Sequence, residues 1–144
     1  MKKRLLIVGG IISLVVGLLW ILSLRIDAHE NQTRDFIKSS FTAVQLQLPA
    51  SFKLRSAVYS PAQSDNGSQY EYIYDADDTI AAASQEIITS LTAANYTIMS
   101  SADDYITAHR DTQPRLFTDI HLGSEVDKKT SKTITLVTFT VSRY

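Results

Sequence analysis

An uninterrupted run of apolar residues is the first pattern along the chain. It extends from Leu5 to Leu24, reads LLIVGGIISLVVGLLWILSL and contains no charged residue. At a rise of about 1.5 Å per residue, a helix of this length spans about 30 Å, the thickness of the hydrocarbon core of a bilayer. The run therefore predicts a transmembrane helix.

The residues that flank this run predict its orientation. Basic residues occupy positions 2–4, and only Arg25 follows the run directly. Positive residues favour the cytoplasmic side, so we expect the N-terminus inside the cell membrane and the rest of the chain outside. A cleaved signal peptide is the alternative, but its apolar region has about 7–15 residues, and the nearest cut, after Ala28, has Ile26 where a small residue is expected. The pattern favours an uncleaved, single-pass signal-anchor whose partner is the lipid bilayer.

A polar segment, residues 26–40, comes next. It contains no Pro or Gly, and Glu30 and Arg34 lie four residues apart, a spacing that supports a helix. We expect a helical stalk here, with a flexible polar linker as the alternative.

Beyond the stalk the apolar period changes from helical to alternating. Alternation over short segments between turn residues is typical of β-strands. In the last segment the parity changes between Leu136 and Val137, which indicates a bulge there or a sheet covered on both faces. The predicted strands are 43–48, 52–59, 70–74, 96–101, 104–109, 115–122 and 133–144.

One helix interrupts these strands. Ile80, Ala83, Ile87, Leu91 and Ala94 recur at helical spacing. Asp77 or Asp78 is the expected N-cap, and Asn95 is expected to adopt the left-handed conformation that ends many helices. Strands around a single helix predict an α+β fold, with an antiparallel sheet packed on one main helix. The expected parts are a basic tip and anchor (1–25), a stalk or linker (26–40) and an extracytoplasmic domain (41–144).

Charge and cysteine content narrow the partners. The chain has 14 basic and 15 acidic residues. Ten of the basic and all 15 acidic residues lie from Ile26 onward, so this part has a net charge of 10 − 15 = −5. A mildly acidic domain gives no indication of the basic surface that nucleic-acid binding requires. The chain has no cysteine, so it forms no disulfide and the domain depends on its core.

A stripe of tyrosines is the candidate ligand-binding surface. Tyr70, Tyr72 and Tyr74 alternate along one predicted strand, so their rings share one face. They form either an exposed platform for a small ligand or glycan, or one wall of the core. Because Glu71 and Asp75 occupy the other face, which is then the solvated one, the pattern favours the core.

Motifs for catalysis and metal binding are missing. Two groups of carboxylates are candidates for calcium binding: Asp75, Asp77 and Asp78 in one, and Asp103 and Asp104 in the other. Neither group has the central Gly and the distal Glu of a calcium loop. We therefore expect the aspartates to cap a helix and to lie in a solvated turn. The histidines, at positions 29, 109 and 121, have no metal-ligand spacing. No nucleophile or nucleotide-binding motif occurs. We expect no catalytic activity, no cofactor and no metal.

Small residues recur within the apolar run. Gly9, Ser13 and Gly17 are four residues apart, so they lie on one face of the predicted helix. Small residues at this spacing favour close packing of transmembrane helices. They predict association of the anchor with itself or with a membrane partner protein.

The order of apolar helix, polar stalk and small antiparallel sheet resembles the architecture of a type IV pilin. A pilin has a Gly processing site just before the apolar run and usually a Glu five residues after the cut. Here MKKR leads directly into Leu5, and no acidic residue lies in the run. A pilin-like assembly subunit therefore stays an alternative to the main prediction, a membrane-anchored extracytoplasmic interaction or accessory module.

Overall fold

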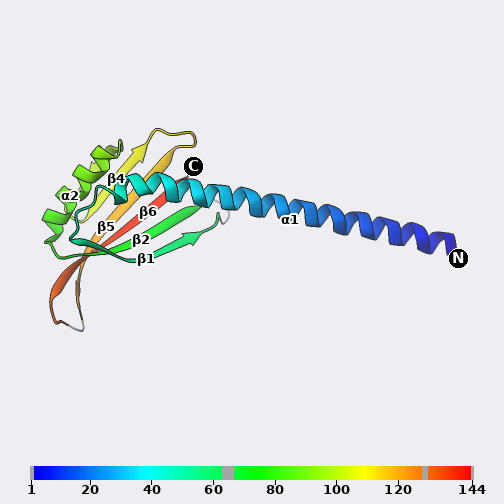
Figure 1. The fold of residues 1–144 in the computed structure, drawn as a ribbon, viewed down its shortest axis with the longest axis horizontal. Coiled ribbons are helices and arrows are strands. Elements are labelled where there is room, and N and C mark those ends of the chain that lie inside the picture. Colours follow the sequence, from blue (N-terminus) through cyan, green and yellow to red (C-terminus); the bar gives the residue numbers. More distant parts are fainter. Residues whose placement is uncertain (1, 63–66, 128–129, 144) are drawn as a thin grey trace. The chain divides into compact units, whose positions relative to one another are not determined.

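A computed structural model describes the backbone of residues 2–62, 67–127 and 130–143, and the side chains in these ranges from residue 14 onward. The described chain forms two helices and six strands (Figure 1). They are α1 (Lys2–Gln45), β1 (Phe52–Ser60), β2 (Gln69–Ala76), α2 (Ile80–Ala93), β3 (Thr97–Ser101), β4 (Tyr105–Arg110), β5 (Leu116–Val126) and β6 (Thr133–Arg143). The fold is α+β, with one long helix and a six-stranded antiparallel sheet.

The chain divides into two compact units, Met1–Thr33 and Arg34–Tyr144. The first unit is helical, and its large apolar side chains from Leu14 to Ile26 are all exposed. Within the residues that the structure describes, no helix is both long enough and apolar enough to cross a membrane. The transmembrane part of the predicted fold is therefore unsupported.

The sheet of the second unit has the strand order β1-β2-β6-β5-β4-β3, and every neighbouring pair is antiparallel. The C-terminal strand β6 lies in the middle, between β2 and β5. Its register with both neighbours is continuous, so of the two alternatives for the parity change, the bulge near Leu136 is wrong. The register shifts instead in the two edge strands, between Leu54 and Ser56 and between Ile98 and Ser100.

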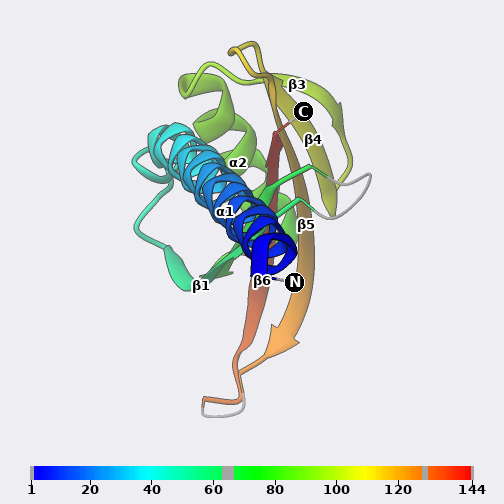
Figure 2. The same cartoon turned by 90° about the vertical axis from the view of Figure 1, so that its right-hand side faces the viewer.

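The end of α1, which belongs to the second unit, and α2 lie on one face of this sheet (Figure 2). The last part of α1 contributes Ile37, Phe41 and Val44, and α2 contributes Ile87 and Leu91; all five are fully buried. The sheet meets them with alternate residues of its inner strands, among them Val137, Phe139 and Val141 of β6. The core is thus a layer between the helices and the sheet. The predicted single main helix is incomplete, because the end of α1 covers the sheet as well.

The predicted strand at 43–48 is wrong. Residues 43–45 belong to α1, and a turn follows. Ile37, Phe41 and Val44 have the i, i+4, i+7 spacing of one helical face, so burying them against the sheet favours the helix.

Two other boundaries differ in detail. Thr79, rather than Asp77 or Asp78, is the N-cap of α2, and its side chain accepts a hydrogen bond of 3.3 Å from the Ala82 N–H. Asn95 has the predicted left-handed conformation, with a φ of 62°, just after the helix ends. β5 continues to Val126, beyond the predicted end at residue 122.

Candidate functional site

The tyrosine stripe lies on the inner face of β2. Tyr72 and Tyr74 are 3% and 5% exposed, so the core interpretation of these two residues is confirmed. Tyr70, at the end of the stripe, is partly buried against the same core. Burial raises the pKa of both Tyr72 and Tyr74, which keeps the two phenols neutral in the folded domain.

The tyrosine rings pack on other aromatic rings. The ring centroid of Tyr72 lies 4.4 Å from that of Phe41 and 5.0 Å from that of Tyr70, and both pairs are stacked. Tyr59 of β1 extends this row, 5.5 Å from Tyr70. The Tyr74 hydroxyl accepts a hydrogen bond of 2.9 Å from Gln45 Nε2. The stripe therefore joins the end of α1 to the sheet.

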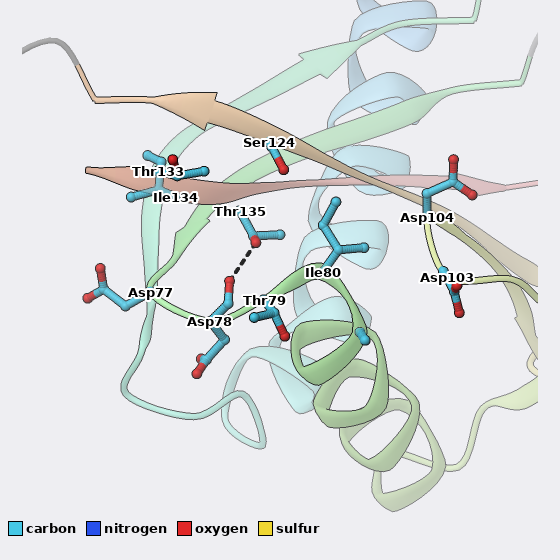
Figure 3. A pocket seen from close by; sticks show the side chains of 11 residues that line it. Asp77, Asp78, Thr79, Ile80, Asp103, Asp104, Ser124, Thr133, Ile134 and Thr135 are labelled. Atoms are coloured by element: carbon cyan, nitrogen blue, oxygen red, sulfur yellow. Dashed lines mark hydrogen bonds between the residues drawn. The ribbon is translucent and has the colours of Figure 1, made fainter. Parts of the chain in front are cut away.

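A cavity of about 850 Å³ lies at the start of α2 (Figure 3). The connection between β3 and β4 lines it with Asp103 and Asp104, and the segment before α2 lines it with Asp77 and Asp78. The sequence predicted each of these carboxylate pairs but did not connect them. Antiparallel pairing of β4 with β5, and of β5 with β6, brings the two pairs to one cavity.

Backbone and side-chain contacts hold the floor of this cavity. Thr135 of β6 donates a hydrogen bond of 2.6 Å to the carbonyl oxygen of Asp78, which ties the start of α2 to the sheet (Figure 3). Ser124 and Thr133 add hydroxyl groups to the lining.

Asp77 has basic partners. Its carboxylate oxygens lie 3.1 Å from Lys132 Nζ and 3.2 Å from Lys53 Nζ. Hydrogen bonds from Lys132 and Lys53 lower the pKa of Asp77. Both lysine partners come from other elements, so Asp77 holds the β5–β6 hairpin and β1 to the segment before α2.

The chemistry available in the cavity is limited. Its lining is made of carboxylates, hydroxyls and the apolar side chains of Ile80, Ala81 and Ile134. No histidine or lysine stands among these lining residues to act as a base. In the described part of the chain, no group of three or more His, Asp or Glu residues could hold a metal ion.

None of the three histidines is among the residues that line this cavity. His29 is exposed on α1. His109 Nε2 lies 3.5 Å from an Asp111 oxygen, and the exposed His121 ring lies 4.6 Å from the Tyr105 ring.

The small residues of the predicted helix-association face are only partly described. Of these residues, Gly9 and Ser13 lie outside the range in which side chains and burial are described. Gly17 lies in α1, and a Cβ built at this position meets nothing within 4 Å.

The outer face of the sheet, opposite the helices, has its own ion-pair group. Arg55 lies 2.8 Å from carboxylate oxygens of both Asp75 and Glu125, so it links β1, β2 and β5. Ile134 and Leu136 are partly exposed on this face, which explains why the parity of apolar residues changes along β6 without a bulge.

The chain matches no protein-family model, no curated protein and no solved structure.

Proposed function

We propose that the chain is a single-pass membrane protein whose outer domain is a non-catalytic interaction or accessory module. Its N-terminus lies in the cytoplasm and its α+β domain lies outside. One observation carries the proposal: the uncharged run 5–24 continues as a helix whose large apolar side chains, from Leu14 to Ile26, are 48–67% exposed. A helix that is apolar all round is typically buried, and lipid is the environment that fits a length of about 30 Å.

The features of the second unit support interaction rather than catalysis. The cavity at the start of α2 combines carboxylates with hydroxyls and has no histidine, lysine or arginine among its described lining residues. The outer face of the sheet and the small residues Gly9, Ser13 and Gly17 are the two surfaces that we assign to partners. The domain's net charge of −5 does not support nucleic acid as one of these partners.

Membrane fractionation tests the anchor. We expect the full chain to stay with membranes after alkaline extraction. Changing Leu14 and Leu18 together to Arg places two charges near the middle of the run, at a cost of about 2.5–3.5 kcal/mol each, and should release the chain. Leu46→Arg is the matched control, because Leu46 is 79% exposed and lies outside the run. Release of the unaltered chain by alkali would overturn the proposal.

Two alternatives from the sequence stay predictions: a ligand-binding tyrosine face and a pilin-like assembly subunit. Iodination of the folded protein addresses the first of them. Ready modification of Tyr72 and Tyr74 would favour a ligand-binding face, whereas resistance of both would count against it.

A further inference from the structure

The sheet has one long free edge. β1 is the last strand in the order, has nine residues and pairs only with β2 in the part of the chain that the structure describes (Figure 1). The opposite edge strand, β3, has five residues. A free edge presents a row of backbone N–H and C=O groups that another extended strand can pair with.

The first half of β1 is protected against such pairing. The Phe52 N–H donates a hydrogen bond of 3.0 Å to the Pro49 carbonyl oxygen, and the register shift follows at Leu54. Lys53 and Arg55 add charge here. Bulges and charged residues are the usual devices that block pairing at an edge.

The second half, Ser56–Ser60, has none of these devices. It reads SAVYS, pairs with β2 in continuous register, and contains no charge. Val58 is 53% exposed, and Ala57 is exposed as well. The basic residues of the first half do not protect this second half, because each is already in an ion pair. Arg55 pairs with Asp75 and Glu125, and Lys53 pairs with Asp77.

We propose that this half-strand pairs with the same half-strand of a second copy of the chain, in antiparallel orientation. An antiparallel edge is complementary to itself under a two-fold axis, so both copies use the same backbone groups. Charge compatibility supports a second copy, because self-pairing of SAVYS places no like charges opposite each other in an acidic domain. The two six-stranded sheets then form one continuous sheet.

The membrane supplies the concentration that this contact needs, and in this respect the inference rests on the proposed function. Pairing of five residues buries far less than the about 1,200–2,000 Å² of a standard stable interface. Two chains held in one bilayer, however, meet at a raised effective concentration. The contact therefore forms in the membrane and is weak for chains free in solution.

Cysteine cross-linking of the full chain in isolated membranes tests the inference. The chain has no cysteine, so Val58→Cys introduces the only thiol. Both copies carry the same cysteine, so the two thiols lie opposite each other only at the residue next to the two-fold axis, where the Cβ atoms are about 4.5–5.5 Å apart. Because a disulfide needs Cα atoms within about 7 Å, we expect it from the variant of the series Ser56→Cys to Ser60→Cys that lies at this axis. We expect several-fold more covalent dimer from the best of these variants than from Met99→Cys, a control on the opposite edge that is 59% exposed.

A charged variant tests the same contact independently. Val58→Lys places a charge on an exposed position, so the domain should keep its fold, as near-ultraviolet circular dichroism of its tyrosines will show. Combined with the best cysteine at another position of the half-strand, it should reduce the cross-link to the level of Met99→Cys, while Met99→Lys should leave it unchanged. Where position 58 itself cross-links best, Ala57→Lys, also at an exposed position, takes the place of Val58→Lys. Equal cross-linking at both edges, or cross-linking that survives Val58→Lys, would overturn the inference.

The two proposals fail in different ways. If alkali releases the chain from membranes but the cysteine pattern persists in concentrated solution, the anchor is wrong and the edge contact stands. If the chain stays in the membrane and the two edges cross-link equally, the anchor stands and the edge contact is wrong.

Discussion

Tyr72 and Tyr74 are two residues apart and equally buried, yet their hydroxyl groups differ. The Tyr74 hydroxyl accepts the hydrogen bond from Gln45, whereas the Tyr72 hydroxyl has no hydrogen-bond partner in the described part of the chain. Both rings pack against aromatic neighbours, Tyr72 on Phe41 and Tyr74 on Phe139. Removing the hydroxyl of each tyrosine in turn therefore shows how much the Tyr74 hydrogen bond adds to stability, because both variants keep their rings.

Tyr74→Phe should lower the free energy of unfolding by about 1 kcal/mol, because it removes one hydrogen bond and leaves the ring in place. Tyr72→Phe should change it by less than about 0.5 kcal/mol, since it removes a buried hydroxyl that is not hydrogen-bonded. Urea titration of the detergent-solubilised full chain measures both values. A larger loss for Tyr72→Phe than for Tyr74→Phe would contradict this assignment.

Asp77→Asn should weaken the domain in a pH-dependent way. The pKa of Asp77 is lowered in the folded state, so its ionised form stabilises the fold above the ordinary value of 3.8, and this stabilisation is lost as the pH falls through the lowered value. The difference in unfolding free energy between the variant and the unaltered chain should thus be largest near neutral pH and shrink below about pH 4. Asp103→Asn is the control, because Asp103 is an exposed carboxylate that forms no ion pair with the described residues. If the difference in unfolding free energy between Asp77→Asn and the unaltered chain grew as the pH fell, a lowered pKa of Asp77 would be contradicted.

Among the elements, the end of α1 shows where sequence reasoning fails. Val44, Leu46 and Leu48 alternate as in a strand, but Ile37, Phe41 and Val44 also fit one face of a helix. Both periods are present over these few residues, and the helix prevails because it buries three side chains on the sheet. The strands from β1 to β6, in contrast, were predictable, because short segments rich in β-branched and aromatic residues lie between turn residues, and most of them alternate.

Phe41→Ala should lower the free energy of unfolding by about 3–5 kcal/mol, because it leaves a void between α1 and the Tyr72 and Phe139 rings. Leu46→Ala should cost less than about 0.5 kcal/mol, since this side chain is mostly exposed. The comparison, by urea titration, tests whether the end of α1 belongs to the packed domain. Similar losses for the two variants would contradict it.

The first turn of α2 gives a second test at this scale. Thr79→Ala should cost about 1 kcal/mol, because the Ala82 N–H loses its side-chain acceptor. Thr79→Ser keeps the hydroxyl and should keep most of this stability. Thermal unfolding followed by circular dichroism distinguishes the two. If the serine variant loses as much as the alanine variant, the cap does not contribute through its hydroxyl.

The candidate cavity was only half predictable. The carboxylate pairs before α2 and after β3 are visible in the sequence, and so is the helix between them. Their meeting depends on the order of strands in the sheet, which joins β4 to β5 and β5 to β6. Strand order follows from long-range pairing, and the local alternation that predicts each strand does not contain it.

At the scale of the whole molecule, the core predicts that the domain folds without the apolar run. The buried apolar cluster extends from Ile37 to Val141, so it lies entirely in the second unit. A fragment of residues 26–144 should therefore unfold cooperatively in urea, with the same near-ultraviolet circular dichroism as the full chain. A fragment without a cooperative transition would show that the first unit is required for folding.

The central position of β6 has a consequence for biosynthesis. β6 is the last strand to be made, yet it joins β1-β2 on one side to β5-β4-β3 on the other. Until β6 leaves the ribosome, the emerging chain has two separate half-sheets with unpaired edges and an incomplete core. The domain therefore completes its fold only after β6 has emerged, and a nascent chain stalled with β6 still inside the ribosome should be sensitive to protease.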